Sequence, residues 1–374
     1  MEQVRVLHVL HSMNCGGAET LLMHLYRGMD REKVQFDFLV NVFDEMYYER
    51  EITSMGGRIY RMPFLTKTTP PVYMHALTKF FRAHPYTIVH SHLETTTGII
   101  LGAARRAGVP VRIAHSHNSR FTRVGLAAVP ENLFKSWCRS RIVPNATHLF
   151  GCSEIANRWL YGKHAGESTT LNNGIDVAAC AFREDTRAEK RAELGLGGGT
   201  VFGHVGRFND QKNHAFLIDV FAGHHATHPH DRLLLAGDGV LRGAVEQQVR
   251  NAGLSDAVSF LGLRSDVPQL LQAMDCFLMP SKFEGLPLSL VEAQAAGLVC
   301  LVADTVSPES DLGTGAFSFL PLRADDWVEA MARVTPQADR QKAASVVTER
   351  GFDSRTQTEK LQAFYLQCVE DLCT

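Results

Sequence analysis

Two glutamates stand eight positions apart in the segment SKFEGLPLSLVEAQAAG, residues 281–297. Glu284 lies in a loop with a glycine and a proline, and Glu292 lies in the helix that the following apolar pattern predicts. The loop amides and the helix dipole favour an anion here by about 0.3–1 kcal/mol at an exposed site. That effect explains an ordinary Glu284 as well as a bound phosphate. A carboxylate at Glu292, next to the packed face of the helix, suits a pair of sugar hydroxyl groups.

A second loop, GHVGRFNDQKNH, follows a predicted strand and precedes a predicted helix. It brings Arg207 and Lys212 together, and two cations beside a helix N-terminus would neutralise a diphosphate as it leaves. A solvated surface loop with a basic pair would look the same. The loop is not a P-loop, because Gly-x4-Gly-Lys-Ser/Thr is absent from the whole chain.

Two glycine turns elsewhere could also approach a phosphate. Gly16 and Gly17, after the first predicted strand, allow close backbone approach at a helix start, although a tight turn needs glycine for its geometry alone. The glycines of LAGDGVLRG, residues 235–243, are spaced one residue too far apart for a dinucleotide fingerprint. An NAD-linked oxidoreductase is therefore a poor candidate.

Histidines form two His-x-His motifs at the ends of neighbouring predicted strands. One motif is VHSHLE, with His90, His92 and Glu94, and the other is RIAHSHN, with His115 and His117. Such pairs are compatible with a metal, or with histidines that only hydrogen-bond a loop. No Asp-x-Asp occurs in the chain, and we predict no essential metal and no cofactor.

The composition is that of an ordinary water-exposed globular protein of 374 residues, 45% hydrophobic and 21% charged. A net charge of -2 gives no reason to expect nucleic acid as a partner. The eight cysteines are scattered without a Cys-x-x-Cys pair, and no apolar run approaches a membrane span. With no N-terminal signal apparent, we expect a cytoplasmic protein.

Short β-rich runs alternate with helical patterns along the chain, which indicates βαβ units and parallel sheets covered on both faces. The pattern restarts after a polar, glycine-rich passage at residues 172–199. We therefore predict two doubly wound domains, residues 1–172 and 173–353. Ligands of such sheets bind beyond the carboxyl ends of the strands, where all the loops described above would lie.

The segment FEGLPLSLVEAQAAG resembles the Glu-x7-Glu signature of retaining glycosyltransferases of family four, which have the GT-B fold. The motifs GGAE, NGID, GRFNDQKN and LAGDG follow the order of that family, so the resemblance covers nearly the whole chain. VLHSMNCGGAETLLMHLYRGMD and RIAHSHN are most similar to the branch that builds bacterial exopolysaccharide and capsular polysaccharide. The resemblance implies an α/β protein of GT-B architecture, with two Rossmann-like domains facing across a cleft.

The same resemblance implies how a nucleotide sugar would be held. Glu284 would bind hydroxyls of the donor sugar, the amides of Gly285 and Leu286 would line the sugar and diphosphate, and Glu292 would bind the ribose. Leu263 and Arg264 would contact the base of the nucleotide. The expected nucleotide is UDP.

Catalysis in this family is implied to be retaining transfer without a metal. Arg207 and Lys212 would clamp the diphosphate, and four glycine or histidine positions would complete the site: Gly16, Gly17, His115 and His117. His117 is the first choice for the histidine near the transferred sugar, with His115 the alternative. His92 and Glu94 would face the acceptor, a glycan that this branch typically carries on a lipid diphosphate.

Residues 119–144 combine five basic residues with interleaved apolar ones and a single acid, Glu131. The stretch suits the surface of an anionic membrane, or a helix that packs through Leu133, Phe134 and Trp137 with a solvated basic face. The resemblance favours the membrane, with the protein peripheral on its inner face. By analogy with the fold, the last helix, residues 354–374, would pack back on the first domain.

Two rival functions remain open. A nucleotide-sugar epimerase has the same architecture but needs acid and base carboxylates near the sugar, where these loops offer glycine, histidine and cations. A non-catalytic nucleotide-sugar-binding subunit would retain the binding residues without turnover. Transfer that depends on an acceptor would exclude the first rival, and turnover by the purified chain alone would exclude the second.

Overall fold

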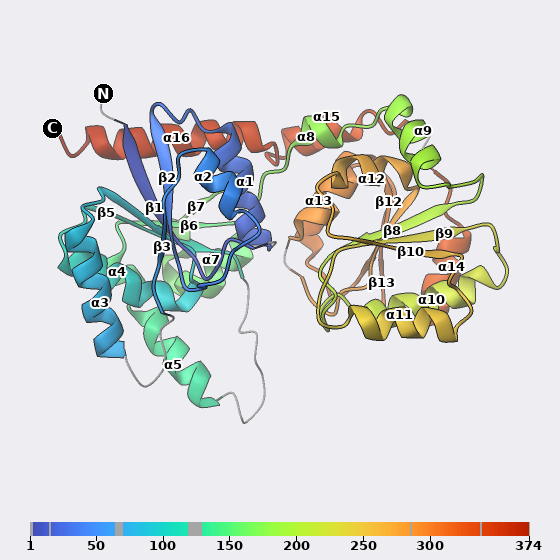
Figure 1. The fold of residues 1–374 in the computed structure, drawn as a ribbon, viewed down its shortest axis with the longest axis horizontal. Coiled ribbons are helices and arrows are strands. Elements are labelled where there is room, and N and C mark those ends of the chain that lie inside the picture. The colour runs from blue at the N-terminus through green and yellow to red at the C-terminus, as the bar shows by residue number, and fades with distance from the viewer. Residues whose placement is uncertain are drawn as a thin grey trace. The chain divides into compact units, whose positions relative to one another are not determined.

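The computed structural model describes residues 3–14, 16–63, 70–118, 129–284, 286–336 and 339–373. The chain forms two compact units (Figure 1). The first comprises Met1–Gly174 together with Ser354–Thr374, and the second comprises Ile175–Asp353. Each unit is a parallel sheet with helices on both faces, so the predicted α/β class with two Rossmann-like domains is confirmed.

The sheet of the first unit has the strand order β3-β2-β1-β4-β5-β6-β7, and every pair in it is parallel. β1 and β2 are almost wholly buried, as parallel strands covered on both faces must be. Six of the seven strands were predicted, and the two-residue β7 was not. The strands are β1 Val4–Val9, β2 Val34–Val40, β3 Ile59–Arg61, β4 Ile88–Ser91, β5 Val111–Ser116, β6 His148–Gly151 and β7 Thr169–Thr170.

Helices cover this sheet in two layers. One layer packs α1 (Gly17–Gly28), α2 (Glu49–Ser54) and α16 (Ser354–Glu370) against one face. The other packs α3 (Pro70–Ala83), α4 (Thr97–Arg106) and the helices that follow it against the opposite face. Those following helices are α5 Val129–Ser140, α6 Ile142–Asn145 and α7 Glu154–Tyr161, with short 3-10 turns at Glu94–Thr96 and Gly162–Glu167.

The last helix, α16, lies beside α1 on the first unit (Figure 1). Its Tyr365 is fully buried under the sheet, and its Gln362 accepts a hydrogen bond from the backbone N–H of Asp30 at 2.9 Å. The chain leaves this unit at Gly174, where an added Cβ would come within 2.8 Å of the Cα of Ser354. Glycine therefore lets the outgoing and returning segments of the chain touch.

The sheet of the second unit has the order β10-β9-β8-β11-β12-β13, again with parallel pairs throughout. The edge strand β13 was not predicted. The strands are β8 Val201–Val205, β9 Arg232–Ala236, β10 Val258–Gly262, β11 Cys276–Met279, β12 Val299–Ala303 and β13 Phe317–Leu320. The helices are α8 Val177–Cys180, α9 Glu184–Glu193, α10 His214–His225, α11 Arg242–Asn251, α12 Val267–Ala273, α13 Leu288–Ala295, α14 Ala324–Ala332 and α15 Ala343–Glu349, with a 3-10 turn at Pro308–Ser310.

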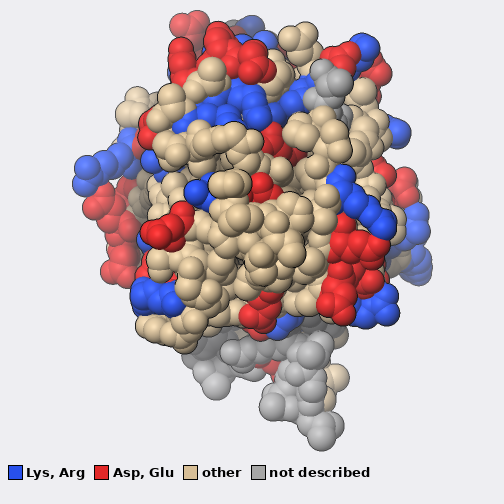
Figure 2. All heavy atoms as spheres, turned by 90° about the vertical axis from the view of Figure 1, so that its right-hand side faces the viewer, with Lys and Arg blue, Asp and Glu red and all other residues tan. Residues whose placement is uncertain are grey.

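Figure 2 shows side chains of both charges around the rim of one face of the molecule, whose centre is largely uncharged. Ion pairs on the second unit include Lys190 with Glu193 at 2.6 Å and Arg323 with Asp326 at 2.6 Å. In the part of the chain that the structure describes, no helix is long and apolar enough to cross a membrane.

Two glycines of α4 provide a matched test of how closely α5 packs on it. A Cβ at Gly98 would lie 2.1 Å from the backbone oxygen of Cys138 in α5, whereas one at Gly102 would meet Asn145 at an ordinary 3.5 Å. We expect Gly98→Ala to lower the free energy of unfolding by about 1–3 kcal/mol through overpacking. Gly102→Ala should be neutral or stabilising by about 0.5–1 kcal/mol. Urea titration of both variants checks this, and equal midpoints would contradict the packing.

Candidate functional site

Lys212 and Glu284, taken from two different loops, form an ion pair at the carboxyl edge of the second sheet. The Lys212 ammonium lies 2.9 Å from Glu284 Oε1, and both side chains are largely buried. Glu284 itself is fixed by a parallel bridge to Val306, and its carbonyl accepts a hydrogen bond from Ser307 N–H at 3.2 Å. The carboxylate is therefore held in place from both sides of its backbone.

The loop of Lys212 is tied to the loop of Glu284 by backbone contacts. Lys282 N–H donates to Gln211 O at 2.8 Å, and the Gln211 amide donates to Phe283 O at 3.0 Å. Asn213, before α10, adopts the left-handed conformation and donates from its side chain to Pro280 O at 3.2 Å. Because asparagine tolerates this conformation better than most residues, it closes the loop at low cost.

Gly237 and Gly239, the glycines of LAGDG, allow two loops to pack closely. The sequence spacing did not predict this role. Gly237 has φ +136°, and an added Cβ would lie 2.0 Å from Gly206 O. A Cβ at Gly239 would lie 2.4 Å from Phe208 O. These glycines allow the loop after β9 to press against the loop after β8, which carries Arg207 at the exposed surface.

Glu292 lies in the second turn of α13 and is half-buried. Burial raises the pKa of its carboxyl to about 7. Pro287 is the N-cap of α13 rather than its first helical residue, and Leu286 beside it packs on a small apolar cluster with Leu288. Gly285 lies outside the described residues. The helix therefore begins a few residues after Glu284, and its first N–H groups have no partner within the helix.

Leu263 and Arg264 differ in their availability to a ligand. Leu263 is 54% exposed, whereas the Arg264 guanidinium pairs with both oxygens of Asp266 at 2.7 and 2.6 Å. Lys190 reaches the same carboxylate at 2.9 Å. The predicted base-reading position thus offers an exposed apolar side chain and an arginine already held by a carboxylate.

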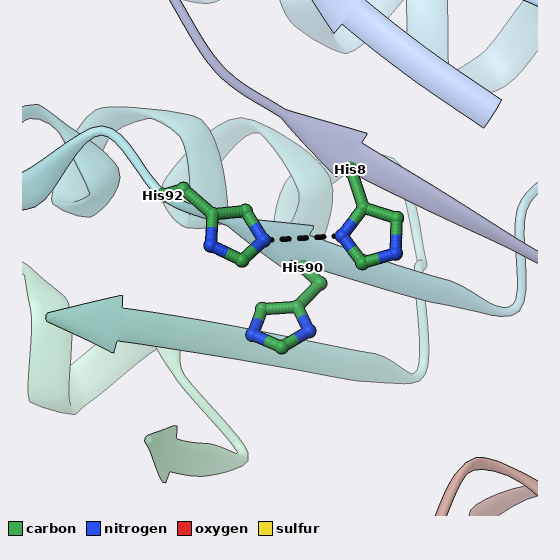
Figure 3. A group of neighbouring side chains, drawn as sticks. All are labelled: His8, His90 and His92. Atoms are coloured by element: carbon green, nitrogen blue, oxygen red, sulfur yellow. Dashed lines mark hydrogen bonds between the residues drawn. The ribbon is translucent and has the colours of Figure 1, made fainter. Parts of the chain in front are cut away.

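The first unit gathers five histidines at the carboxyl edge of its sheet. His90 and His92 come from β4 and the residue after it, and His115 and His117 from β5 and the residue after it. The fifth is His8, inside β1, which the sequence prediction missed (Figure 3). In the sequence, a histidine within the apolar run VRVLHVL could have indicated this role. In the structure, β1 pairs with β4 in a register that sets His8 opposite His90.

Hydrogen bonds join these imidazoles in two rows. In the first row, His8 Nδ1 is 3.1 Å from His92 Nε2, and His92 Nδ1 is 2.8 Å from His117 Nε2. In the second, His90 Nε2 is 3.1 Å from His115 Nδ1. Burial lowers the pKa of His117 to about 4 and holds those of the other four well down, so the rows are neutral at pH 7.

His115 and His117 differ in their exposure and in their hydrogen-bond partners. Their rings stack with centroids 4.4 Å apart. His115 is buried and bonded to His90, whereas His117 is half-buried, and its backbone N–H donates to Glu94 Oε1 at 2.9 Å. Glu94 has a left-handed backbone with φ 49°, and burial raises its pKa to about 8.

The Gly16–Gly17 turn differs between its two glycines. Gly16 is the extended N-cap of α1, and a Cβ there would meet the carboxylate of Glu19 at 2.3 Å. A Cβ at Gly17 would meet nothing within 4 Å. The start of α1 therefore has free space beside Gly17, whereas the carboxylate of Glu19 occupies the space beside Gly16.

Glu292 gives a prediction for stability against pH. Its folded-state pKa of about 7 lies above the ordinary 4.5, so between these values the folded chain binds more protons than the unfolded chain. The free energy of unfolding therefore falls as pH rises through this window. Glu292→Gln lacks this loss and should be more stable than the parent by about 1 kcal/mol above pH 7, a value reduced for partial exposure.

Urea titrations of parent and variant on both sides of the window measure this difference. Below pH 4.5 the gain should vanish, because the carboxyl is then protonated in both states. Glu329→Gln, at an exposed position of α14, serves as the control and should show no such pH dependence. A gain for Glu292→Gln that is constant with pH would contradict the prediction.

Each of the two units is similar to a known protein family. A family model described as "Glycosyl transferase 4-like domain" matches residues 16–170, and one described as "Glycosyl transferases group 1" matches residues 186–345. The chain is 38% identical over 372 residues to the glycosyltransferase EpsF of Bacillus subtilis, covering 97% of this chain and 96% of that protein.

Two further proteins are similar over most of the chain. The UDP-Gal:alpha-D-GlcNAc-diphosphoundecaprenol alpha-1,3-galactosyltransferase of Escherichia coli is 28% identical over 315 residues, 79% of each protein. The crystal structure of Anabaena HepE in complex with UDP superposes with a TM-score of 0.77 at 18% identity, covering 97% of this chain and all of that one. The second similarity is one of fold.

Proposed function

Because the chain belongs to the family-four glycosyltransferases, we propose that it moves a sugar from a UDP-sugar to a lipid-linked glycan in surface polysaccharide synthesis. The Escherichia coli relative is named for a UDP-sugar donor and a diphosphoundecaprenol acceptor. HepE was crystallised with UDP and with UDP-glucose. These names support a UDP-sugar as the donor and a lipid diphosphate as the acceptor's carrier.

The observation that carries the proposal is the buried Lys212–Glu284 pair. In this proposal the Glu284 carboxylate, paired with Lys212, accepts hydrogen bonds from hydroxyls of the donor sugar. The start of α13, a few residues after Glu284, would offer free N–H groups to the diphosphate. Arg207, at the exposed surface of the same loop, adds a second cation for the leaving group.

Glu292 and the base-reading position complete the donor site in this proposal. A carboxylate in the second turn of α13 binds two ribose hydroxyls, which favour its ionised form near pH 7. Leu263 provides an exposed apolar surface for the base, while Arg264 stays bound to Asp266. In the first unit, the start of α1 is open at Gly17.

The reaction we propose retains the configuration of the sugar and needs no metal. The diphosphate leaves toward Arg207, Lys212 and the helix start, and the acceptor hydroxyl attacks from the same face. A leaving-group oxygen takes the hydroxyl proton, and the cations stabilise the charge that develops. His117, the predicted functional histidine, is a neutral imidazole of the first unit, close to His92, His115 and Glu94.

Thermal shift against UDP-, GDP- and ADP-sugars tests the donor site. A ligand at about 100 times its Kd should stabilise the parent by about 2.7 kcal/mol. Lys212→Ala and Glu292→Ala should each weaken binding roughly 10- to 100-fold, because each removes a charged hydrogen-bond partner. Lys342→Ala, at an exposed lysine of the same unit, should bind as the parent does.

Turnover then separates the proposal from its rivals. Sugar transfer by the purified chain should require a lipid-linked acceptor, give a product with the donor's anomeric configuration, and continue after chelation. An acceptor-independent change in the donor sugar would indicate an epimerase instead. Binding without any turnover would indicate a non-catalytic subunit, and no binding of any nucleotide sugar would overturn the site.

The surface of α5 supports peripheral attachment to a membrane. Val129, Leu133 and Trp137 are spaced four residues apart, so they share one face, and all three are exposed. Leu133 is 67% exposed, so it is not the packing residue that the alternative interpretation required. The Arg141 guanidinium lies 5.1 Å from the centre of the Trp137 ring. Residues 119–128, with their two arginines, lie outside the described residues.

We expect the purified chain to sediment with anionic vesicles and much less with neutral ones. Leu133→Asp should reduce binding about tenfold, because it places a charge on the apolar face of α5. Val72→Asp, at an exposed valine of α3, is the matched control and should leave binding unchanged. Equal losses for both variants, or equal binding to neutral vesicles, would contradict attachment through α5.

A further inference from the structure

The five histidines bring several ring nitrogens unusually close together. Two sets of three each offer one nitrogen per residue, with all of these atoms within 4.8 Å of one another. One set is His8, His90 and His92, which Figure 3 shows with the rings of His8 and His92 joined by a hydrogen bond. The other is His92, His115 and His117.

The hydrogen bonds distinguish the two sets. His90 has both nitrogens engaged, with Tyr365 Oη at 2.7 Å from Nδ1 and His115 Nδ1 at 3.1 Å from Nε2. In the second set, His115 Nε2 is buried and has no hydrogen-bond partner among the described residues. His115 is only 1% exposed, so bulk solvent does not reach this atom.

We propose that His92, His115 and His117 bind a divalent transition-metal ion of the zinc class. Neutral imidazole nitrogen is a preferred ligand of such ions, at about 2.0–2.1 Å, and three protein ligands leave a fourth position open. The contributing atoms are His92 Nδ1, His117 Nε2 and His115 Nε2. The first two are already 2.8 Å apart, so a small opening of this pair admits the ion.

The remaining nitrogens fit the tautomers that this coordination requires. With Nδ1 as ligand, His92 carries its proton on Nε2 and donates it to His8 Nδ1, 3.1 Å away. With Nε2 as ligand, His115 donates from Nδ1 to His90 Nε2, and His90 then donates from its own Nδ1 to Tyr365 Oη. Two of the three ligands thus have a hydrogen-bonded second nitrogen, as metal-bound histidines almost always do.

Glu94 places a carboxyl group beside His117. Its Oε1 accepts hydrogen bonds from His117 N–H at 2.9 Å and from the Asn118 amide at 3.0 Å. Its Oε2 is buried without a hydrogen-bond partner in the described part of the chain.

The ion is a regulator of transfer rather than a participant in it, a consequence that rests on the proposed role of His117. An ion held by His117 Nε2 removes that nitrogen from any contact with the transferred sugar. Zinc should therefore inhibit sugar transfer, and chelation should restore it. The binding itself does not depend on that role.

Titration of the chelator-stripped full chain with Co²⁺, followed by visible absorption, tests the site. We expect about one Co²⁺ per chain with the intensified bands of four-coordinate cobalt, displaced by Zn²⁺. His92→Ala and His115→Ala should abolish these bands. Tyr365→Phe, which removes the acceptor for His90, should weaken binding about 10- to 100-fold without removing a ligand.

Controls separate this site from other ligands and from unfolding. His230→Gln, at an exposed histidine, and Cys373→Ser, at the exposed cysteine, should bind as the parent does. Circular dichroism identifies any variant that fails to fold, and His8→Phe perturbs the cluster while leaving all three ligands in place. Weak cobalt bands in the parent, or bands unchanged in both alanine variants, would overturn the metal site and leave a hydrogen-bonded network of imidazoles. Binding without zinc inhibition would overturn only the regulatory consequence.

Discussion

Parallel strand pairing is the constraint on which the rest of this structure depends. Because every paired strand in both sheets runs in the same direction, each sheet collects all of its strand-to-helix loops at one edge. That is how Lys212, after β8, meets Glu284, after β11, although 72 positions separate them in sequence number (284 − 212). The same constraint brings His8, His92 and His117 together from three strands. Chemistry in each unit therefore follows from the topology of its sheet.

Burial then decides the electrostatic character of each edge. In the first unit it keeps five imidazoles uncharged, so their nitrogens are available as hydrogen-bond acceptors and metal ligands rather than as cations. In the second unit the Lys212 ammonium nitrogen and Glu284 Oε1 lie 2.9 Å apart, and both side chains are largely buried. The two sheets share an architecture, but one edge carries imidazoles and the other carries an ammonium group and a carboxyl group.

Much of this could be predicted from the sequence, because long apolar runs and glycine-containing loops are local signals. β1, β4 and β8 were found in this way, and so was the loop position of Lys212. The edge strand β13 was missed because its pattern is half-exposed and short. His8 was missed because its role depends on register with β4, which is a long-range property. The outward direction of Leu133 likewise depends on which face of α5 packs on α4, and sequence spacing does not fix that choice.

The path of the chain has a consequence for how the protein is made. The second unit, Ile175–Asp353, is inserted between Gly174 and Ser354 of the first. α16 is therefore synthesised after the whole second unit, yet its Tyr365 fills the centre of the first sheet's apolar layer and bonds His90. The part of the chain that leaves the ribosome first is completed last, and until then one face of its sheet lacks a helix. A nascent chain of this topology needs protection of that apolar face throughout synthesis of the second unit.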